Sequence, residues 1–441
     1  MKKLVATALS VAMVAGAAST LVSCSGSSAK AGKVLNIYVW NDEFKSRFET
    51  YYASKVPADV KVNFVQTPNQ DNAYQNKLDE VLKAQKDAAA DEKVDIFLVE
   101  ADYALKYVDT PYTMDVIKEI GLTEADLANQ FKYTKDIMTD SKGALKGVSW
   151  QGCPGGFIYR RSIAKAVLGS DDPAVVQEAL ADWNKFDEVA AKAKSKGYFM
   201  LSGFDDDFRV FSDNVKTKWV VGDKITIDPM IERWIDQTKE YTEKGYNNKA
   251  NLWSAESFAG AKKDGKVFGY FGPAWFLDFC LCPNTLDDPE KGNVVGNGSY
   301  GDWAFCKGPM GFSWGGTWIC GAAGSDNVEL IKDVMKTLTC DKETMVKIAT
   351  EMGDFTNNEP AMREVAASDY KNEFLGGQNH VALFIDSAAS IDKSCMSMYD
   401  QGMCEKIQAA FADYFNGKVD KETAWNNFYT SIMEKYPNLQ K

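Results

Sequence analysis

The sequence predicts a two-lobed α/β fold, in which each lobe has a mixed sheet flanked by helices and hinge strands join the lobes. Strand-like and helix-like segments alternate from about residue 33 onward. Three breaks interrupt this alternation, near residues 148, 308 and 357. A chain of 441 residues is also too long for one core, because single cores stop growing at roughly 250–300 residues. We expect one lobe to comprise residues 33–148 and 309–357, and the other residues 149–308 and 358–441.

The first residues have the pattern of an export signal. A basic start at Lys2 and Lys3 precedes an apolar run, and the stretch Leu21-Val22-Ser23-Cys24 is similar to a lipoprotein cleavage site. We expect residues 1–23 to be removed as a signal peptide and Cys24 to be acylated, with a plain signal peptide as the alternative. Residues 24–32 are small and polar, which is typical of a flexible tether. The predicted location is the outer face of the cytoplasmic membrane, with lipid on Cys24 as the anchor.

Charge and cysteine content narrow the classes of ligand. The net charge of −12 argues against nucleic acid or an anionic membrane as the ligand. Without Cys24, eight of the nine cysteines remain, an even number that permits disulfides, but their spacing does not decide whether they pair. Cys306, Cys320 and Cys340 have apolar neighbours, which is typical of buried free thiols. His380 is the only histidine, and no second C-x-x-C pair accompanies the cysteines, so we expect no metal site and no cofactor.

The first part of the chain predicts strands over residues 34–40, 60–65 and 94–99, with helices beginning near residue 44 and spanning 74–90. This order favours a parallel sheet with helices on both faces. Ligands of such sheets bind beyond the carboxyl ends of the strands. The polar and aromatic residues at the carboxyl ends of strands one and three are Trp40, Asn41, Asp42, Glu43, Glu100 and Asp102. Of these, Asp42 better fits a helix cap or a turn.

The rest of the chain repeats the alternation after each break. Strands are predicted over residues 157–161, 267–271 and 318–321, and helices from residue 182 and over 229–245, 255–263 and 327–339. Gly308-Pro309 marks the second break, and Asn357 to Pro360 marks the third, before a helical C-terminal part. A chain that passes several times between two lobes predicts a cleft that closes about hinge strands.

The order of these parts resembles the bacterial extracellular solute-binding proteins of carbohydrate ABC transporters, which have the maltose-binding-protein type of periplasmic-binding-protein fold. The resemblance rests on residues 21–24, 35–40, 94–97, 147–161, 268–275 and 315–319. It implies a monomeric receptor, not an enzyme, that holds a sugar between its lobes and delivers it to the permease subunits of a membrane transporter.

Sugar recognition needs flat aromatic faces for C–H groups and acids or amides for hydroxyls. Tryptophans at predicted strand ends or breaks are Trp40, Trp150, Trp275, Trp314 and Trp318; for each, packing in the core is an equal alternative, and it is favoured for Trp318. Polar candidates beside them are Asn41, Glu43, Glu100, Asp102, Gln151 and Asp278. These segments lack a cluster of Arg or Lys, so we expect a neutral or weakly polar monosaccharide or oligosaccharide, bound without being altered.

The stretch SWGGTW at residues 313–318 combines two indoles with Gly315 and Gly316. Glycines there allow unusual φ angles and close approach of the backbone to a ligand, so we expect Trp314 to face the cleft, with a simple bulge at Gly316 as the alternative. Trp183, Trp219, Trp234 and Trp425 fall in helix-like or loop patterns and are expected to pack.

Two other functions fit parts of the pattern. Carboxylates and tryptophans in a cleft also describe a surface glycoside hydrolase, but the sequence singles out no pair of acids, and His380 lies in no triad motif. A lipid-anchored carbohydrate adhesin would explain the lipid anchor but not the hinge-like crossings between the lobes. For Asp205 to Asp207, binding of calcium or sugar is the alternative to a solvated loop with an ion pair to Arg209, which we expect.

Overall fold

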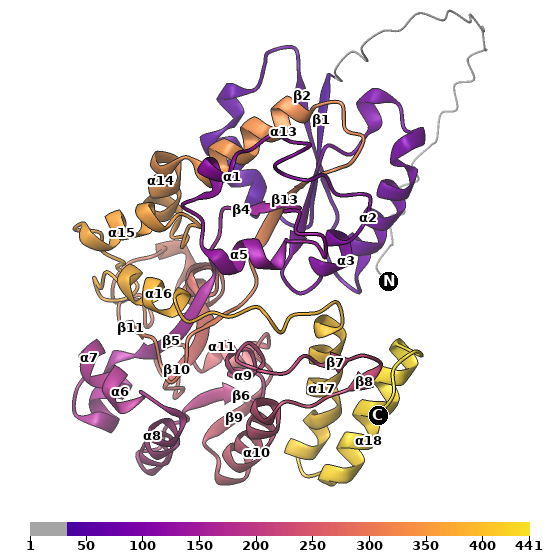
Figure 1. Cartoon of the computed structure of the whole chain (residues 1–441). Coiled ribbons are helices and arrows are strands. Elements are labelled where there is room, and N and C mark those ends of the chain that lie inside the picture. The colour runs from indigo at the N-terminus through magenta and orange to yellow at the C-terminus, as the bar shows by residue number, and fades with distance from the viewer. Residues whose placement is uncertain (1–32) are drawn as a thin grey trace, which may run out of the picture.

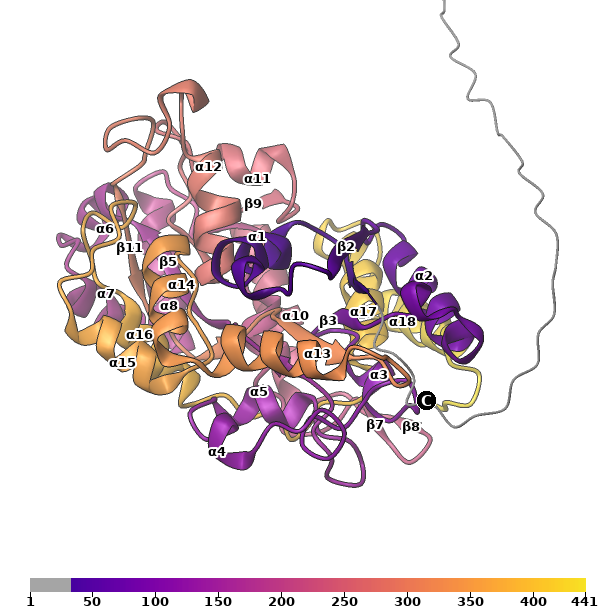
Figure 2. The same ribbon diagram turned by 90° about the horizontal axis from the view of Figure 1, so that it is seen from above.

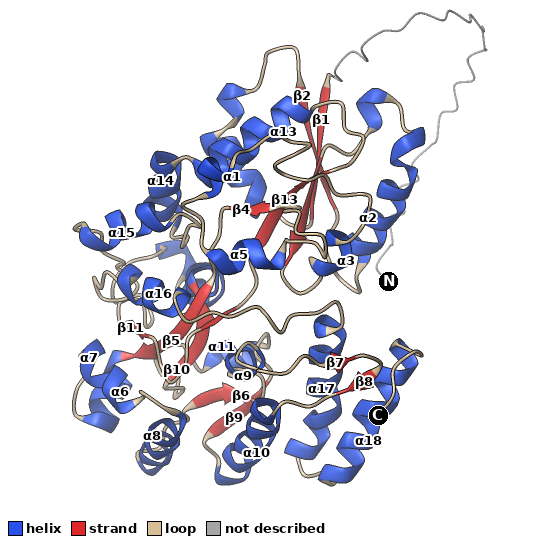
Figure 3. Cartoon of the chain, in the orientation of Figure 1, coloured by secondary structure: helices blue, strands red, loops and turns tan. Residues whose placement is uncertain are grey.

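The computed structural model describes residues 33–441 and has a mixed α/β architecture of two lobes (Figure 1, Figure 3). The predicted signal peptide, the tether and Cys24 lie outside the described residues. In the described part, no helix is both long and apolar enough to cross a membrane.

The first lobe is built on a five-stranded sheet in the order β2-β1-β3-β13-β4. Its strands are β1 (Val34–Val39), β2 (Lys61–Gln66), β3 (Ile96–Glu100), β13 (Thr317–Gly321) and β4 (Val148–Ser149). Strand β1 runs parallel to β2 and β3, whereas β13 is antiparallel to β3 and to β4. The sheet is therefore parallel over its first three strands, as predicted, and mixed as a whole.

Helices cover both faces of this sheet, with α1 and α13 on one side and α2 and α3 on the other (Figure 3). The helices of this part are α1 (Glu43–Tyr51), α2 (Ala73–Ala84), α3 (Leu105–Val108), α4 (Glu124–Leu127), α5 (Lys132–Ile137), α13 (Val328–Met335) and α14 (Lys342–Met352). Burial on both faces explains why β1 and β3 read as continuous apolar runs, since Leu35, Ile37, Ile96 and Phe97 are all fully buried.

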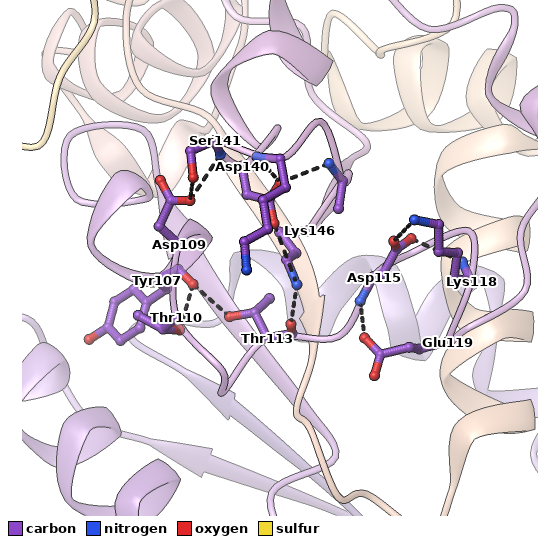
Figure 4. A network of polar contacts seen from close by, with 12 residues as sticks. Tyr107, Asp109, Thr110, Thr113, Asp115, Lys118, Glu119, Asp140, Ser141 and Lys146 are labelled. Atoms are coloured by element: carbon purple, nitrogen blue, oxygen red, sulfur yellow. Dashed lines mark hydrogen bonds and ion pairs between the residues drawn. The ribbon is translucent and has the colours of Figure 1, made fainter.

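Residues 109–146, which connect helix α3 to β4, are tied to one another by polar contacts (Figure 4). The Asp109 carboxylate accepts hydrogen bonds from the backbone N–H and the hydroxyl of Ser141, at 2.9 and 2.6 Å. Lys146 Nζ donates to the carbonyl of Thr113, at 2.9 Å. These bonds fix the loops that lead into β4 and so into the first passage between lobes.

The second lobe centres on β5 (Pro154–Arg160), which pairs antiparallel with β10 (Gly269–Pro273), β11 (Trp303–Cys306) and β12 (Phe312–Ser313). Two small sheets extend it: β6 (Leu201–Gly203) with β9 (Asn247–Ala250), and β7 (Val220–Val221) with β8 (Lys224–Ile225). Its helices are α6 (Arg161–Leu168), α7 (Pro173–Ala179), α8 (Trp183–Ser195), α9 (Phe208–Ser212), α10 (Pro229–Lys244), α11 (Ala255–Ala259), α12 (Cys282–Asn284), α17 (Asp400–Phe415) and α18 (Lys421–Lys435).

Capping residues define the ends of several of these helices. The Asp182 side chain caps α8 by accepting from the N–H groups of Asn184 and Lys185. Helix α10 has an Asp228 cap, a proline at its first position and Gly245 in the left-handed conformation at its end. The predicted helix over residues 74–90 ends at residue 84, where a 3₁₀ turn replaces it.

The chain passes between the two sheets from β4 to β5 and again from β12 to β13. A third passage leads from α14 to α15 (Glu359–Ala367) and then to α16 (Val381–Ala388), which packs against β5. This passage runs beside the first one, because the Gly152 N–H donates to the Phe355 carbonyl, at 2.9 Å, and Asn357 Nδ2 donates to the Ser149 carbonyl, at 3.0 Å. The lobe boundaries near residues 148, 308 and 357 stay a prediction.

The expectation for Asp205 to Asp207 was wrong. Asp206 and Asp207 are buried, and the Asp206 carboxylate accepts from the backbone N–H groups of Ser202 and Gly203, at 2.5 and 3.1 Å. Arg209 pairs with Asp102 instead of this run. The segment is an internal turn stabilised by backbone donors at the end of β6, because these buried N–H groups need acceptors.

All eight cysteines of the described residues are free thiols, and Cys306 and Cys320 are fully buried, whereas Cys340 is half-buried. Within residues 33–441, no cluster of His, Cys, Asp or Glu has the arrangement of a metal site.

Candidate ligand-binding site

A cavity of about 650 Å³ lies between the lobes. The first lobe contributes the turn after β1, one face of α1, the end of β3 and Gln151, which follows β4. The second lobe contributes Trp253, Trp275 and the π-helical turn over Phe276–Leu281. Seen from above, the segment that carries α11 and α12 extends past α1 of the first lobe (Figure 2). The volume is in the range of pockets that hold small molecules.

Tryptophans from both lobes give the cavity its apolar surface. Trp275 follows β10, and its Nε1 donates to the Trp314 carbonyl at 2.9 Å, while the two rings meet edge to face with their centroids 4.9 Å apart. Trp253 lies parallel to Trp275, with centroids 6.4 Å apart, and 55% of its surface is exposed. Trp40 faces them from the first lobe and packs edge-on against Tyr74. The cavity thus presents open indole faces.

Gly315 and Gly316 are required by the backbone between Trp314 and β13. Both adopt positive φ angles, +70° and +107°, which side chains rarely tolerate. A Cβ on Gly315 would also lie 3.3 Å from the Trp275 ring, and the Gly316 carbonyl accepts from the Ala101 N–H at 3.2 Å. The glycines therefore let the chain turn tightly enough to set Trp314 against Trp275 in the cavity wall.

The turn after β1 and the start of α1 supply polar groups on one side of the cavity. Glu43 and Arg47 are four residues apart on α1 and so share a face of the helix. Gln151 Nε2 donates to Glu43 Oε1 at 2.7 Å. Burial raises the pKa of Glu43 to about 7, and the charge of Asp354 adds to this rise. Arg47 is buried and binds Asp354 through two hydrogen bonds, at 3.0 and 2.8 Å.

Glu100 lies at the carboxyl end of β3 and lines the same cavity. Its carboxylate accepts from the backbone N–H of Asp102 at 2.8 Å. Burial raises the pKa of Glu100 to about 8, with a further contribution from Asp102. The site therefore combines indole faces with carboxyl and amide groups, which suits a ligand with apolar faces and hydrogen-bonding edges.

A family model described as "Bacterial extracellular solute-binding protein" matches residues 47–374. The chain belongs to the bacterial extracellular solute-binding proteins. The family is extracellular, so this solute-binding protein is exported. None of the curated protein sequences matches the chain.

Solved structures share the fold of this solute-binding protein at low sequence identity. An extracellular solute-binding protein of family 1 is 18% identical, with a TM-score of 0.74, and the match covers 91% of this chain and 99% of that one. The galacto-N-biose-/lacto-N-biose I-binding protein of an ABC transporter from Bifidobacterium longum, in complex with lacto-N-biose, is 13% identical, with a TM-score of 0.68, over 93% and 98% of the two chains. An ABC transporter associated binding protein from B. animalis subsp. lactis, in complex with β-1,6-galactobiose, is 15% identical, with a TM-score of 0.66, over 92% and 99%.

The structure brings most of the predicted site residues of this solute-binding protein into the cavity wall: Trp40, Asn41, Glu43, Glu100, Gln151, Trp275, Trp314, Gly315 and Gly316. Trp318 is buried and donates to the Thr134 carbonyl, in line with the packing role favoured for it.

Three predicted site residues do not line the cavity. Trp150 is 1% exposed, packs on Phe44, and donates through Nε1 to Asp354 at 3.2 Å. Asp102 turns away to form two hydrogen bonds with Arg209 of α9, at 2.7 and 2.5 Å. Burial alone would raise the pKa of Asp102, but Arg209 holds it below its ordinary value. This pair joins the two lobes of the solute-binding protein beside the cavity.

Asp278 is the third residue outside the cavity wall. A Cβ on Gly353 would lie 2.3 Å from its Oδ2, so this carboxyl group points toward the end of α14. Burial, with the charge of Asp354 next, raises the pKa of Asp278 well above its ordinary value.

Several cavity residues were not predicted: Ser46, Arg47, Trp253, Phe279, Cys280 and Thr317. Asp42 also lines the cavity. It stands at the N-cap position of α1, in the bend after β1, but of the cap and the turn expected for it the side-chain cap is not made. Helical spacing from Glu43 would have found Arg47. Trp253 lies in the loop between β9 and α11, just past the end of a strand that the sequence analysis did not predict, so no predicted strand end pointed to it.

Proposed function

We propose that this chain is the substrate-binding lipoprotein of an ABC importer, which captures a sugar or oligosaccharide between its lobes and delivers it to a membrane permease. The observation that carries the proposal is the cavity between the lobes, where open indole faces from both lobes meet carboxyl and amide groups. Such walls match both the C–H faces and the hydroxyl edges of a sugar ring. Two proteins of similar fold were solved in complex with lacto-N-biose and with β-1,6-galactobiose, which supports this choice.

The proposed roles follow from position in the wall. Trp40, Trp253, Trp275 and Trp314 stack on the sugar, and Asn41, Glu43, Glu100 and Gln151 bind its hydroxyls. Gly315 and Gly316 bring the backbone close to the ligand. The receptor acts as a monomer, and acylated Cys24 anchors it to the outer face of the cytoplasmic membrane.

The test is a thermal-shift screen over sugars with the full-length mature protein. A ligand that binds only the folded state stabilises it by roughly 2.7 kcal/mol at one hundred times its Kd, so one sugar should raise the unfolding temperature clearly. Trp275→Ala and Trp314→Ala should abolish this rise, whereas Trp425→Ala, on α18, should keep it.

Two results would change the assignment. If the sugar is recovered cleaved after long incubation, the glycoside hydrolase alternative replaces a binding protein. If no sugar raises the unfolding temperature but a peptide or an amino acid does, the ligand class is wrong and only the receptor function stands.

A further inference from the structure

The cavity wall carries more negative than positive side chains. Asp42, Glu43 and Glu100 contribute carboxyl groups, and Arg47 is the one basic residue among the described residues of the wall. Burial of a carboxylate costs free energy unless a cation or several donors compensate it. These acids can therefore ionise at low cost only if cations nearby are free to pair with them.

Each cation near Glu43 and Glu100, which are half-buried, is held by another acid. Arg47 is bound bidentately by Asp354, and the side chains of this pair are only 3% and 2% exposed. On the other side, Arg209 is bound bidentately by Asp102. Both cations therefore have a counter-ion already, and neither forms an ion pair with Glu43 or Glu100.

Lys393, the remaining cation beside Glu100, is in contact with Asp213. The direct partners of the two glutamates are neutral: the Gln151 amide for Glu43 and the Asp102 backbone N–H for Glu100. Asp354 lies close enough to Glu43, and Asp102 to Glu100, to oppose ionisation of the glutamates. Arg47 offsets part of the charge of Glu43, and Arg209 and Lys393 offset part of that of Glu100, but each of these cations has another acid as its direct partner. Neither glutamate therefore has an ion pair of its own.

The aromatic walls favour positive charge as well. The face of an indole attracts a cation more strongly than other aromatic rings do. Trp253 exposes 55% of its surface and lies parallel to Trp275, and Trp40 and Trp314 complete the wall. A cationic group in the cavity would meet carboxylates at its edge and indole faces around it.

We propose that the ligand is a sugar that carries a protonated amine, and that Glu43 and Glu100 are the residues that select it over the neutral sugar of the same shape. The inference rests on the proposed function and narrows its substrate class. The amine supplies the positive charge that the two glutamates lack, and the sugar ring stacks on the tryptophans.

The experiment uses matched pairs of sugars that differ only in an amine or a hydroxyl: glucosamine and glucose, galactosamine and galactose, and the β-1,4-linked disaccharides of glucosamine and glucose. Thermal shift at pH 7 identifies the best pair, and calorimetry then measures both affinities. We expect the amine to bind about tenfold or more tightly than its hydroxyl twin, the gain typical of a charge-assisted hydrogen bond.

Variants assign this preference to the two glutamates. Glu43→Gln and Glu100→Gln should each bring the ratio of the two affinities toward one. Glu49→Gln is the matched control, because Glu49 is an exposed acid on the same helix as Glu43 and does not line the cavity, so the ratio should stay that of the wild type.

The pH dependence of the wild type provides a second readout that needs no variant. Between pH 5.5 and 7 the amine stays mostly protonated, while Glu43 and Glu100 must lose protons to bind it. Affinity for the amino sugar should therefore rise with pH in this range, whereas affinity for its hydroxyl twin should not.

The outcomes separate the two proposals. If a hydroxyl twin binds as well as its amine, or the affinity for the amine does not rise with pH, the inference is overturned and the sugar-binding function stands. If no sugar of either kind binds, the proposed function fails and the inference fails with it.

Discussion

Asp354 should be a major contributor to the stability of the folded chain, because it is the counter-ion of a buried arginine. Its carboxylate receives two hydrogen bonds from Arg47 and one from Trp150 Nε1, and both members of the ion pair are at most 3% exposed. Asp354→Asn keeps the shape but removes the charge. Breaking a buried pair in this way costs about 3–5 kcal/mol, and we expect the lower end because the amide oxygen still accepts one bond.

The assay is urea unfolding at pH 7, followed by tryptophan fluorescence, with the free energy obtained by linear extrapolation. The matched control is Asp136→Asn, which breaks a pair whose lysine, Lys132, is 84% exposed and should cost less than about 0.5 kcal/mol. The double variant Arg47→Met with Asp354→Leu should recover most of the loss, because it removes both buried charges together. A loss below about 1 kcal/mol for Asp354→Asn would refute the reasoning, since Arg47 would then have another effective counter-ion.

Three further predictions concern the ligand, the pH and the anchor. Trp253→Ala should lower ligand affinity about three- to tenfold in calorimetry and leave the unfolding temperature unchanged, because the ring is 55% exposed; an unchanged affinity would remove Trp253 from the site. Burial lowers the pKa of His380 from 6.5 to about 4, so between these pH values the unfolded chain binds one more proton than the folded chain. The free energy of unfolding should therefore fall by about 3 kcal/mol as the pH falls from 6.5 to 4. His380→Leu should lose that part of the pH dependence, and parallel curves of unfolding free energy against pH for the two proteins would contradict it. Cys24→Ala should release the protein from membranes, and a variant that still fractionates with membranes in high salt would exclude the lipid anchor.

Much of the fold follows from local patterns in the chain. Strands β1 and β3 are apolar on both faces, and helices α8 and α10 begin at aspartate caps, so residue type and spacing suffice to place them. The antiparallel strands of the first sheet could not be predicted from local patterns in the sequence. Strand β13 enters it antiparallel from more than 200 residues further along the chain, and no local pattern encodes that pairing.

Residues of the cavity wall could be predicted from the sequence where a side chain at a strand end points into the cavity. Trp40 directly follows β1, Glu100 is the last residue of β3, and both line the cavity. Trp150 has an equally suitable position, but its ring turns into the core, where Phe44 and Asp354 receive it. Asp102 is lost to the site because Arg209, 107 residues away, is its partner, and the choice between two nearby acids depends on tertiary structure.

The position of β13 in the first sheet has a consequence for the timing of folding. Strand β13 pairs with β3 on one side and β4 on the other, so the sheet lacks an inner strand until residues 317–321 are present. Contacts between such distant segments form late, because a long loop must close before they contribute stability. The first two thirds of a newly made chain therefore cannot complete this lobe, which favours a loosely structured chain until residues 317–321 have been added. That is the state in which a polypeptide can still be threaded through a membrane.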